Sequence, residues 1–462
     1  MEKMGKETEK NTQQGLAKGV VGYREVLAQG IASGAPAAAT IGTLTGAAAF
    51  AYGALPLAVA IALIMVLLDA TRLSIIARYV QSAGGIYAFI ERGLGKKVAF
   101  VASMAYTIYI FAVIIFVYLI MGLMVPTGIE ELGINLPSWI WIPLGLVNAI
   151  VSVIISYLGI RPSLKFTLIM SIAEITGIIA TSILIFSKIP PDINTFTLAY
   201  VPPPKISNLG LGVSFGILAF TGYETVSVLG EEAKDPRNNI AKGVFTAALL
   251  LGITYIVGSE AFTVGWGVNN MSTYFNYLAP GLILAKTFGG TILLIILTAL
   301  LINSNLACAT GFTNCVTRVM YAMSVDKLLP SKLSSIHPKR RTPHIASLFT
   351  FIFTALYFII MSLIFSPSNI FIATGITTTF GFLIAIFVVN ISMLIVVKKN
   401  NALNIGNILI VAIVEAIIGY VFYATVITSA INVPVLIGVL TLVLWVVGGI
   451  IYLTLKRFFT QK

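Results

Sequence analysis

The sequence predicts an all-α integral membrane protein with twelve transmembrane helices, in which two inverted five-helix repeats precede two further helices. Three observations predict this fold. Of the 462 residues, 58% are hydrophobic and only 10% are charged, which is outside the range of soluble globular domains. Twelve apolar stretches can each cross roughly 30 Å of hydrocarbon at about 1.5 Å per residue. Two of these stretches are interrupted by glycine at corresponding places in the two halves of the chain.

The expected spans occupy most of the chain, so no soluble domain is expected beside them. Their limits are 26–51, 55–79, 98–125, 138–159, 165–187, 209–230, 243–265, 287–318, 345–365, 369–396, 405–430 and 434–455. The first repeat is expected in residues 24–187, the second in 209–396, and the two additional helices in 403–456. An odd number of helices per repeat places the second repeat upside down in the membrane.

The polar segment 1–23 and the loop charges predict the orientation. Residues 1–23 lack the apolar core of a signal peptide, so we expect a disordered cytoplasmic tail before a retained first span. With this tail inside, only Lys188, Lys205 and Lys286 of the 29 Lys and Arg residues fall outside. The net charge of +12 therefore follows the positive-inside rule and does not indicate nucleic-acid binding. We expect a multi-pass plasma-membrane protein with both termini cytoplasmic.

The first interrupted span contains the segment Gly-Ile-Ala-Ser-Gly-Ala-Pro at residues 30–36. In lipid an unpaired backbone group costs several kcal/mol, so such a break needs a partner for its backbone. A half-helix that begins near Pro36 would offer free N–H groups to an anion, and the preceding half-helix would offer carbonyls to an ammonium group. The predicted substrate-binding residues are Gly30, Ile31, Ala32, Ser33, Gly34 and Ala35. The alternative is a kink whose backbone groups are satisfied by neighbouring helices.

The second interrupted span contains Phe-Thr-Gly-Tyr-Glu at residues 220–224, and its glycine lies 188 residues after Gly34. A second break in the matching position favours a binding site over a simple kink. The predicted substrate-binding residues here are Phe220, Thr221, Gly222 and Tyr223. Phe220 is also predicted to gate the site as a lid, with ordinary packing as the alternative. Glu224 would begin the second half-helix, and we expect it to cap that helix, with a ligand contact as the alternative.

Four acidic residues lie within the expected spans, where each costs roughly 2.5–3.5 kcal/mol at a helix centre. Asp69 is followed three residues later by Arg72, which predicts a local ion pair. Glu260 is expected near the outer end of its span, within reach of water, and Glu415 lies outside the repeats. Glu174 has no basic residue within one helical turn. We expect it to carry the coupling proton, with a hydrogen-bonded structural acid as the alternative.

Other polar residues give weaker indications. Tyr106 and Tyr109 on the third span would either line and gate the pocket or simply pack, and Tyr106 is the predicted gating residue of the two. Cys308 and Cys315 lie about 10 Å apart along one helix and are expected to be packing residues, since that distance is too long for a disulfide. Polar clusters at 303–305 and 374–379 are typical of helix–helix hydrogen bonding.

The motifs of enzymes are missing from this sequence. Both histidines, His337 and His344, lie in a basic loop, and the chain has no HExxH, Walker A or GxSxG pattern. No catalytic residue, metal site or cofactor is therefore predicted, and a hydrolase or an ATP-driven pump is not indicated.

Three segments resemble the amino acid–polyamine–organocation (APC) superfamily of permeases, which has the LeuT-type fold. They are FTGYETVSVLGEEAKDPRNNI at 220–240, SAGGIYAFIERGL at 82–94 and RVMYAMSVDKLLP at 318–330. The resemblance covers roughly residues 28–344 and implies discontinuous helices 1 and 6.

The resemblance also implies roles for individual residues. Ala32, Ser33 and Gly34 correspond to the unwound segment whose amides hold the substrate carboxylate, and Phe220 corresponds to a gating aromatic. The chain departs from the family at Ala32, where glycine is common, and at Pro36, where a large apolar residue is common. Glu174 falls at or near the helix-five position where some members carry a lysine in place of a sodium ion.

These observations predict a secondary active transporter that moves amino acids across the plasma membrane by alternating access, with proton-coupled uptake. Its partners would be an amino acid, the proton and the lipid bilayer, and no nucleic acid. The small and apolar residues around the breaks favour a neutral or apolar substrate. The alternatives are an amino acid or polyamine exchanger, or a sensor or channel that does not transport.

Overall fold

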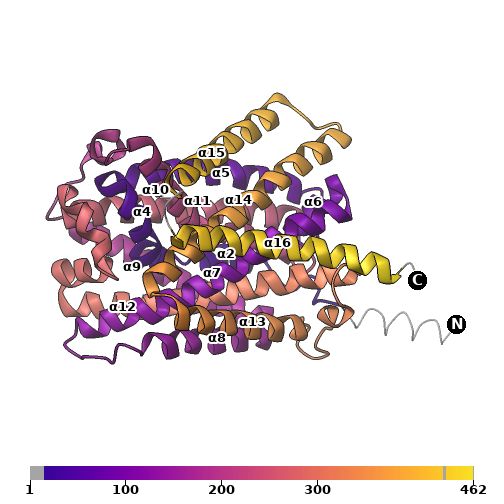
Figure 1. Ribbon diagram of the computed structural model, residues 1–462, viewed down its shortest axis with the longest axis horizontal. Coiled ribbons are helices and arrows are strands. Elements are labelled where there is room, and N and C mark those ends of the chain that lie inside the picture. The colour runs from indigo at the N-terminus through magenta and orange to yellow at the C-terminus, as the bar shows by residue number, and fades with distance from the viewer. Residues whose placement is uncertain (1–14, 430–432, 461–462) are drawn as a thin grey trace.

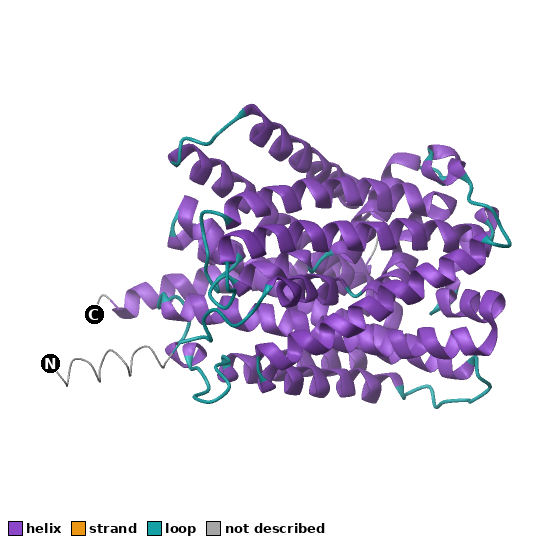
Figure 2. Ribbon diagram, turned by 180° about the vertical axis from the view of Figure 1, so that it is seen from behind, coloured by secondary structure: helices purple, strands orange, loops and turns teal. Residues whose placement is uncertain are grey.

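The computed structural model describes residues 15–429 and 433–460, and every regular element in these ranges is helical (Figures 1 and 2). The principal helices are α2 (Tyr23–Gly34), α3 (Pro36–Ala38), α4 (Leu44–Ala51), α5 (Leu55–Ala77), α6 (Ile86–Leu94), α7 (Lys96–Glu130), α8 (Trp141–Leu158), α9 (Ile160–Phe186), α10 (Lys205–Phe220), α11 (Pro236–Trp266), α12 (Pro280–Val325), α13 (His344–Ile364), α14 (Pro367–Lys399), α15 (Ile405–Ser429) and α16 (Val433–Thr460). Most of the long helices run along the length of one bundle (Figure 1). Residues 1–14 of the predicted tail lie outside the described residues.

Eleven helical stretches in the described ranges are long and apolar enough to cross a membrane. The expectation of an all-helical, multi-pass membrane protein is therefore confirmed. The first stretch, Tyr23–Ala77, has 55 residues and contains both of the expected spans 26–51 and 55–79. These two spans meet at Tyr52, whose φ of 50° turns the chain. The number of twelve spans and the inverted repeats remain predictions.

Helix limits agree with the hydropathy of the sequence except where a helix extends beyond its apolar core. The largest difference is α12, which has 46 residues where the sequence predicts 287–318. A straight helix of that length would measure roughly 69 Å, more than twice the hydrocarbon thickness. Helix α12 is instead kinked at Gly290, which has φ 70° and ψ −167°.

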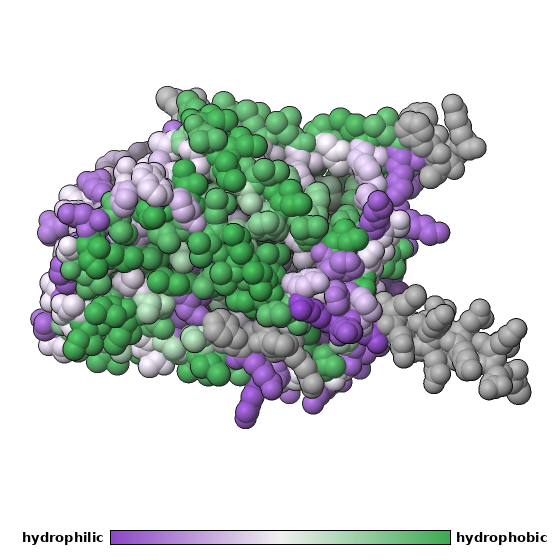
Figure 3. All heavy atoms as spheres, turned by 90° about the horizontal axis from the view of Figure 1, so that it is seen from below, coloured by the Kyte–Doolittle hydropathy of each residue, from purple (hydrophilic) through white to green (hydrophobic). Residues whose placement is uncertain are grey.

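The centre of the bundle consists of α7 and α10, whose apolar segments are almost wholly buried. Helix α7 packs against α12 and α14, and α10 packs against α4 and α5. A helix that is apolar on all sides is stable only in such a central position or in lipid. The outer helices α8, α13, α15 and α16 keep large apolar residues exposed, and Figure 3 shows apolar surface between more polar ends.

The last residues of the predicted tail are ordered, which corrects the expectation of disorder for residues 15–23. The N–H groups of Val20 and Val21 donate to the Glu232 carbonyl at 2.8 and 3.0 Å, and the Lys234 N–H donates to the Val21 carbonyl at 2.9 Å. The Glu232 side chain accepts from Arg318 at 2.6 Å and 3.0 Å in a buried, two-bonded ion pair. Backbone pairing with the loop around Glu232 therefore holds this short segment in place.

Candidate functional site

The first helix is broken at Ala35. Helix α2 ends at Gly34, Ala35 adopts a left-handed conformation with φ 50° and ψ 65°, and α3 begins at Pro36. A left-handed alanine is strained by roughly 1–2 kcal/mol. The following residue suits the break because proline at the first helical position lacks the N–H that would be unpaired there. The break thus lies one residue beyond the expected Ser33–Gly34, and a π-helical turn, Ala39–Thr43, joins α3 to α4.

The second break lies at Thr221 and Gly222. Helix α10 ends at Phe220, Gly222 has φ 121°, and a 3₁₀ helix, η5, continues over Tyr223–Leu229. The Thr221 hydroxyl donates to the Leu218 carbonyl at 2.8 Å and so satisfies one of the carbonyls at the end of α10. A φ of this value is strained for any residue with a side chain, which explains the glycine.

The two breaks meet in space although they are far apart in the sequence. A Cβ atom added to Gly222 would lie 2.5 Å from the Ser33 carbonyl carbon and 2.6 Å from the Gly34 nitrogen. Beside this contact the Thr225 hydroxyl donates to Ser33 Oγ at 3.0 Å. The Gln29 side-chain amide donates to Thr225 Oγ1 at 3.2 Å and to the Gly311 carbonyl at 2.9 Å. The structure therefore brings the residues predicted at the two breaks together.

Neighbouring helices supply partners for the backbone groups at the first break. The Tyr255 hydroxyl on α11 donates to the Gly34 carbonyl, and the Cys308 thiol on α12 donates to the Ser33 carbonyl at 3.0 Å. At the start of α3, the Ala37 N–H donates to Glu174. The next amide, that of Ala38, donates to Ser304 Oγ at 3.1 Å. A ligand at this break therefore has to replace some of these hydrogen bonds.

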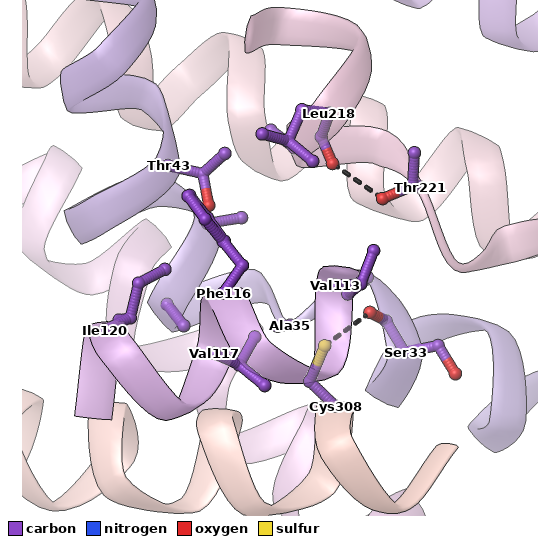
Figure 4. Close-up of a pocket in the computed structure, with 14 residues that line it drawn as sticks. Ser33, Ala35, Thr43, Val113, Phe116, Val117, Ile120, Leu218, Thr221 and Cys308 are labelled. Atoms are coloured by element: carbon purple, nitrogen blue, oxygen red, sulfur yellow. Dashed lines mark hydrogen bonds between the residues drawn. The ribbon is translucent and has the colours of Figure 1, made fainter. Parts of the chain in front are cut away.

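A small cavity of about 20 Å³ lies beside the breaks (Figure 4). It is lined by Ser33, Gly34, Ala35, Ala38, Ala39, Thr43, Val113, Phe116, Val117, Ile120, Leu218, Ala219, Thr221 and Cys308. Such a volume holds about one water molecule. Four predicted binding residues line it, namely Ser33, Gly34, Ala35 and Thr221. The lining is otherwise formed mainly by small and apolar side chains from the first helix, α7 and α10.

The remaining predicted residues lie around the cavity without lining it. Gly30 is a packing glycine, since an added Cβ would meet Ala247 and Val226 within 3 Å. Ile31, Ala32 and Gly222 are buried at the breaks next to the lining residues, and Tyr223 points to α5. The predicted gating residues are also buried. The Phe220 ring packs edge-on against Tyr255, with centroids 5.0 Å apart. The Tyr106 hydroxyl lies 3.5 Å from Cys315 Sγ.

Glu224 holds the second break together. Its carboxylate accepts from the Gly222 N–H at 2.8 Å and from the Tyr109 hydroxyl at 2.6 Å, and its side chain is fully buried. The Glu224 carboxylate thus bonds to the backbone at the start of η5, as expected of a capping residue. Tyr109 therefore contacts the site through Glu224, and it does not line the cavity.

Glu174 connects three helices next to the first break. Its carboxylate accepts from the Ala37 N–H at 3.2 Å, from Ser304 Oγ at 2.5 Å and from Asn303 Nδ2 at 2.5 Å. The side chain is 1% exposed, and none of the ion pairs in the described part of the chain includes it. A carboxylate at this place also interacts with the positive end of α3. The polar cluster at 303–305 thus bonds to a buried acid as well as to helix backbone.

The other intramembrane acids have structural partners. Asp69 forms the expected ion pair with Arg72, with Arg72 Nε 3.0 Å from Asp69 Oδ1, and also accepts from the Tyr223 hydroxyl. Glu415 accepts from the Asn390 side-chain amide. Glu260 was expected to lie within reach of water, but the structure buries it.

Glu260 is 5% exposed because the loop before α10 covers it. It accepts from the Asp192 N–H at 2.8 Å and from the Thr195 hydroxyl at 2.6 Å. In the same loop the Asn194 N–H and the Tyr200 hydroxyl hold the pKa of Asp192 below its usual range. Sequence hydropathy gives no signal of this covering loop.

Several residues that contact the breaks were not identified from the sequence. Tyr255, Gln29 and Thr225 contact the breaks directly, and Cys308 is more than a packing residue because it donates to the Ser33 carbonyl. Gln29 carries a signal, since it lies one helical turn before Ser33 and is a polar residue in an apolar span. Both cysteines are free and buried, as expected.

Comparison with known proteins identifies the family of this chain. A family model described as amino acid permease matches residues 25–461. The chain belongs to the amino acid permease family. The resemblance to the APC superfamily is therefore confirmed over almost the whole chain. Members of this family are transporters, so the expectation that the chain is not an enzyme is also confirmed.

This permease is similar to several curated transporters. It is 27% identical over 352 residues to the branched-chain amino acid permease BcaP of Bacillus subtilis, covering 67% of this chain and 69% of that protein. It is 24% identical over 274 residues to BcaP of Lactococcus lactis, covering 56% and 58%. It is 25% identical over 304 residues to the low-affinity putrescine importer PlaP of Escherichia coli, covering 63% and 64%. The matches to BcaP of Lactococcus lactis and to PlaP thus span less than two thirds of those proteins.

Proposed function

We propose that this chain is a secondary active transporter that moves a neutral, branched or otherwise apolar amino acid across the plasma membrane by alternating access. The observation that carries the proposal is the direct contact between the two helix breaks beside a small cavity. Two discontinuous helices that meet near mid-membrane supply both helix ends that a zwitterion needs. The positive-inside distribution of Lys and Arg supports cytoplasmic termini, and the matched positions of the breaks support the inverted repeats.

The substrate's carboxylate binds amide groups between Ser33 and the start of α3, and its ammonium group binds carbonyls at the ends of α2 and α10. In the structure these backbone groups bond to Tyr255, Cys308, Glu174 and Ser304, so binding exchanges one set of partners for another. The cavity of about 20 Å³ is smaller than any amino acid, so the half-helices have to separate for binding. Gly34 beside the first break and Gly222 at the second give the backbone the conformational freedom that this motion needs.

The chemistry of the cavity favours an apolar side chain on the substrate. Val113, Phe116, Val117, Ile120 and Leu218 form its apolar wall. Such a wall stabilises a branched aliphatic side chain by roughly 0.8 kcal/mol per buried methylene group. The similarity to two proteins named branched-chain amino acid permeases points the same way.

A polyamine substrate is the second candidate, because the chain is similar to a protein named a putrescine importer. A dication in a buried site requires carboxylate partners. No acidic residue lines the cavity in the described part of the chain, and Glu174 and Glu224 are each bonded to backbone amides. The amino acid is therefore the better supported substrate.

Glu174 is the proposed carrier of the coupling proton. As a carboxylate it holds the amide end of α3 together with Ser304 and Asn303. Protonation removes the charge that interacts with the positive helix end and weakens the hold on α3. Proton binding at Glu174 would in this way alter the half-helix that carries the carboxylate site.

Counterflow of radiolabelled leucine into proteoliposomes tests the proposal. If the protein is a carrier, proteoliposomes that are loaded with unlabelled leucine accumulate labelled leucine transiently, because exchange across the membrane is faster than the net loss of leucine. An overshoot with leucine and none with putrescine is expected. An overshoot with putrescine alone would favour the polyamine. Equilibration without any overshoot would indicate a channel, and no uptake of either label would indicate a sensor.

A further inference from the structure

A second pocket lies at the end of the bundle where α2 begins, away from the proposed substrate site. It has a volume of about 520 Å³ and opens between the start of α2, the end of α5 and the first turns of α11. Its polar lining consists of Tyr23, Thr71, Ser74, Arg78, Lys242 and Thr246. Two cations and four hydroxyl groups thus converge on one recess.

The two cations are available to a ligand. Arg78 and Lys242 are both exposed, and neither takes part in an ion pair in the described part of the chain. Among the residues that the structure describes, no acidic side chain lines the pocket. Two like charges that line one recess repel each other, so an anion bound between them relieves this repulsion.

Hydroxyl groups fix the shape of the recess. The Tyr23 hydroxyl donates to Thr246 Oγ1 at 3.1 Å, which joins α2 to α11 and leaves the Thr246 hydrogen for a ligand. The Ser74 hydroxyl lies 2.6 Å from the Ala241 carbonyl and joins α5 to α11. These bonds fix α2, α5 and α11 relative to one another, and with them the backbone positions that carry the two cations.

An apolar track leads from the pocket along the membrane-facing side of the same helix. Phe245, Leu249 and Ile253 follow Lys242 at helical spacing and are 39%, 37% and 51% exposed. Residues four apart lie on one face of a helix, so the three side chains form one stripe. The combination of a cationic recess at the end of a span and an apolar stripe toward mid-membrane matches a phospholipid, whose phosphate and acyl chain are covalently joined. A free phosphate would use the recess alone.

We propose that this pocket binds the phosphate headgroup of an anionic phospholipid, with an acyl chain along Phe245, Leu249 and Ile253. Arg78 donates to the phosphate oxygens in a forked geometry and Lys242 contributes a second charge. Lys242 lies in the second turn of α11, so its long side chain reaches the headgroup level while its carbon atoms cover apolar surface. This site is separate from the proposed transport function and does not depend on it.

Thermal unfolding of the purified full-length chain in detergent, titrated with phosphatidylglycerol, tests the proposal. A ligand that binds the native state raises its apparent melting temperature. Phosphatidylglycerol is expected to raise it, and phosphatidylcholine and inorganic phosphate are not. The double variant Arg78→Gln with Lys242→Gln is expected to weaken the apparent lipid affinity about 30-fold, roughly fivefold for each cation.

Two matched variants keep the test interpretable. Arg237→Gln removes an exposed cation from the first turn of α11 outside the pocket and should leave the lipid response unchanged. Arg78→Lys with Lys242→Arg alters the same two positions but keeps both charges, and it should retain most of the response. A loss of response in this variant as well would indicate misfolding. The proposal is overturned if the double Gln variant still responds to phosphatidylglycerol, if Arg237→Gln loses the response equally, or if phosphatidylcholine or inorganic phosphate stabilises the wild type as strongly.

Discussion

Gly222 lies directly against the peptide bond that follows Ser33, so close that a Cβ atom at position 222 would be 2.5 Å from the Ser33 carbonyl carbon. Real Cβ atoms do not approach backbone this closely, so the contact needs glycine both for its space and for its φ of 121°. Each break therefore limits the position of the other. Motion at one half-helix is expected to be transmitted to the second break through this contact.

Removing the charge of Glu174 tests proton coupling. Glu174→Gln keeps the size of the side chain but removes the negative charge near the start of α3. We expect leucine uptake driven by a pH gradient to fall at least about tenfold, while counterflow, which needs no gradient, is largely kept. Initial rates of both reactions in proteoliposomes measure this.

The control for this experiment is Glu415→Gln, which alters a half-buried acid on the peripheral helix α15. This acid bonds to Asn390 of α14. Its gradient-driven uptake should match the wild type. If Glu174→Gln itself takes up leucine normally under a pH gradient, Glu174 is a structural acid and the coupling proton binds elsewhere.

The hydroxyl of Tyr255 is expected to stabilise the first break. Tyr255→Phe leaves the buried Gly34 carbonyl without its donor, which should destabilise the protein by about 1–3 kcal/mol. Tyr420→Phe is the matched control, because Tyr420 donates to the Ile206 carbonyl in an exposed position where water can replace it. Melting temperatures in detergent should show a clear decrease for Tyr255→Phe only. Equal small decreases would mean that the Gly34 carbonyl has other partners.

The loop over 192–200 should lose order in acid. Hydrogen bonds from Asn194 and Tyr200 stabilise the ionised form of Asp192 and lower its pKa below the ordinary 3.8. A group with a lowered folded pKa stabilises the structure fully above its unfolded pKa and loses that contribution as the pH falls through the folded value. Amide protection of 193–200 in the wild type is therefore expected to persist at neutral pH and to fall only below pH 3.8.

Asp192→Asn is the comparison for this measurement. It should show reduced protection of the same amides already at neutral pH, because the charge that accepts hydrogen bonds from Asn194 and Tyr200 is gone. Hydrogen exchange followed by mass spectrometry measures the amide protection of the wild type and of Asp192→Asn. Unchanged protection in Asp192→Asn would mean that Glu260 alone holds the loop through the Asp192 N–H and Thr195.

Hydropathy and local spacing predicted the helices, both breaks and the ion pair of Asp69 with Arg72, because these depend on residues close together in the sequence. The partners of the breaks could not be predicted in this way. Tyr255 is 221 residues from Gly34, and Ser304 is 130 residues from Glu174, so only the packing of the bundle brings them together. The order of Val20 and Val21 likewise depends on backbone pairing with a distant loop.

The central claim, that one substrate site forms where the two breaks meet, is tested most directly by equilibrium binding of radiolabelled leucine to purified wild type, Gly222→Ala and Gly419→Ala. Gly419 lies in α15 with nothing within 4 Å of an added Cβ, so its substitution controls for adding a methyl group. We expect saturable binding by the wild type and by Gly419→Ala, and at least tenfold weaker binding by folded, monodisperse Gly222→Ala. Wild-type affinity in Gly222→Ala would contradict the account.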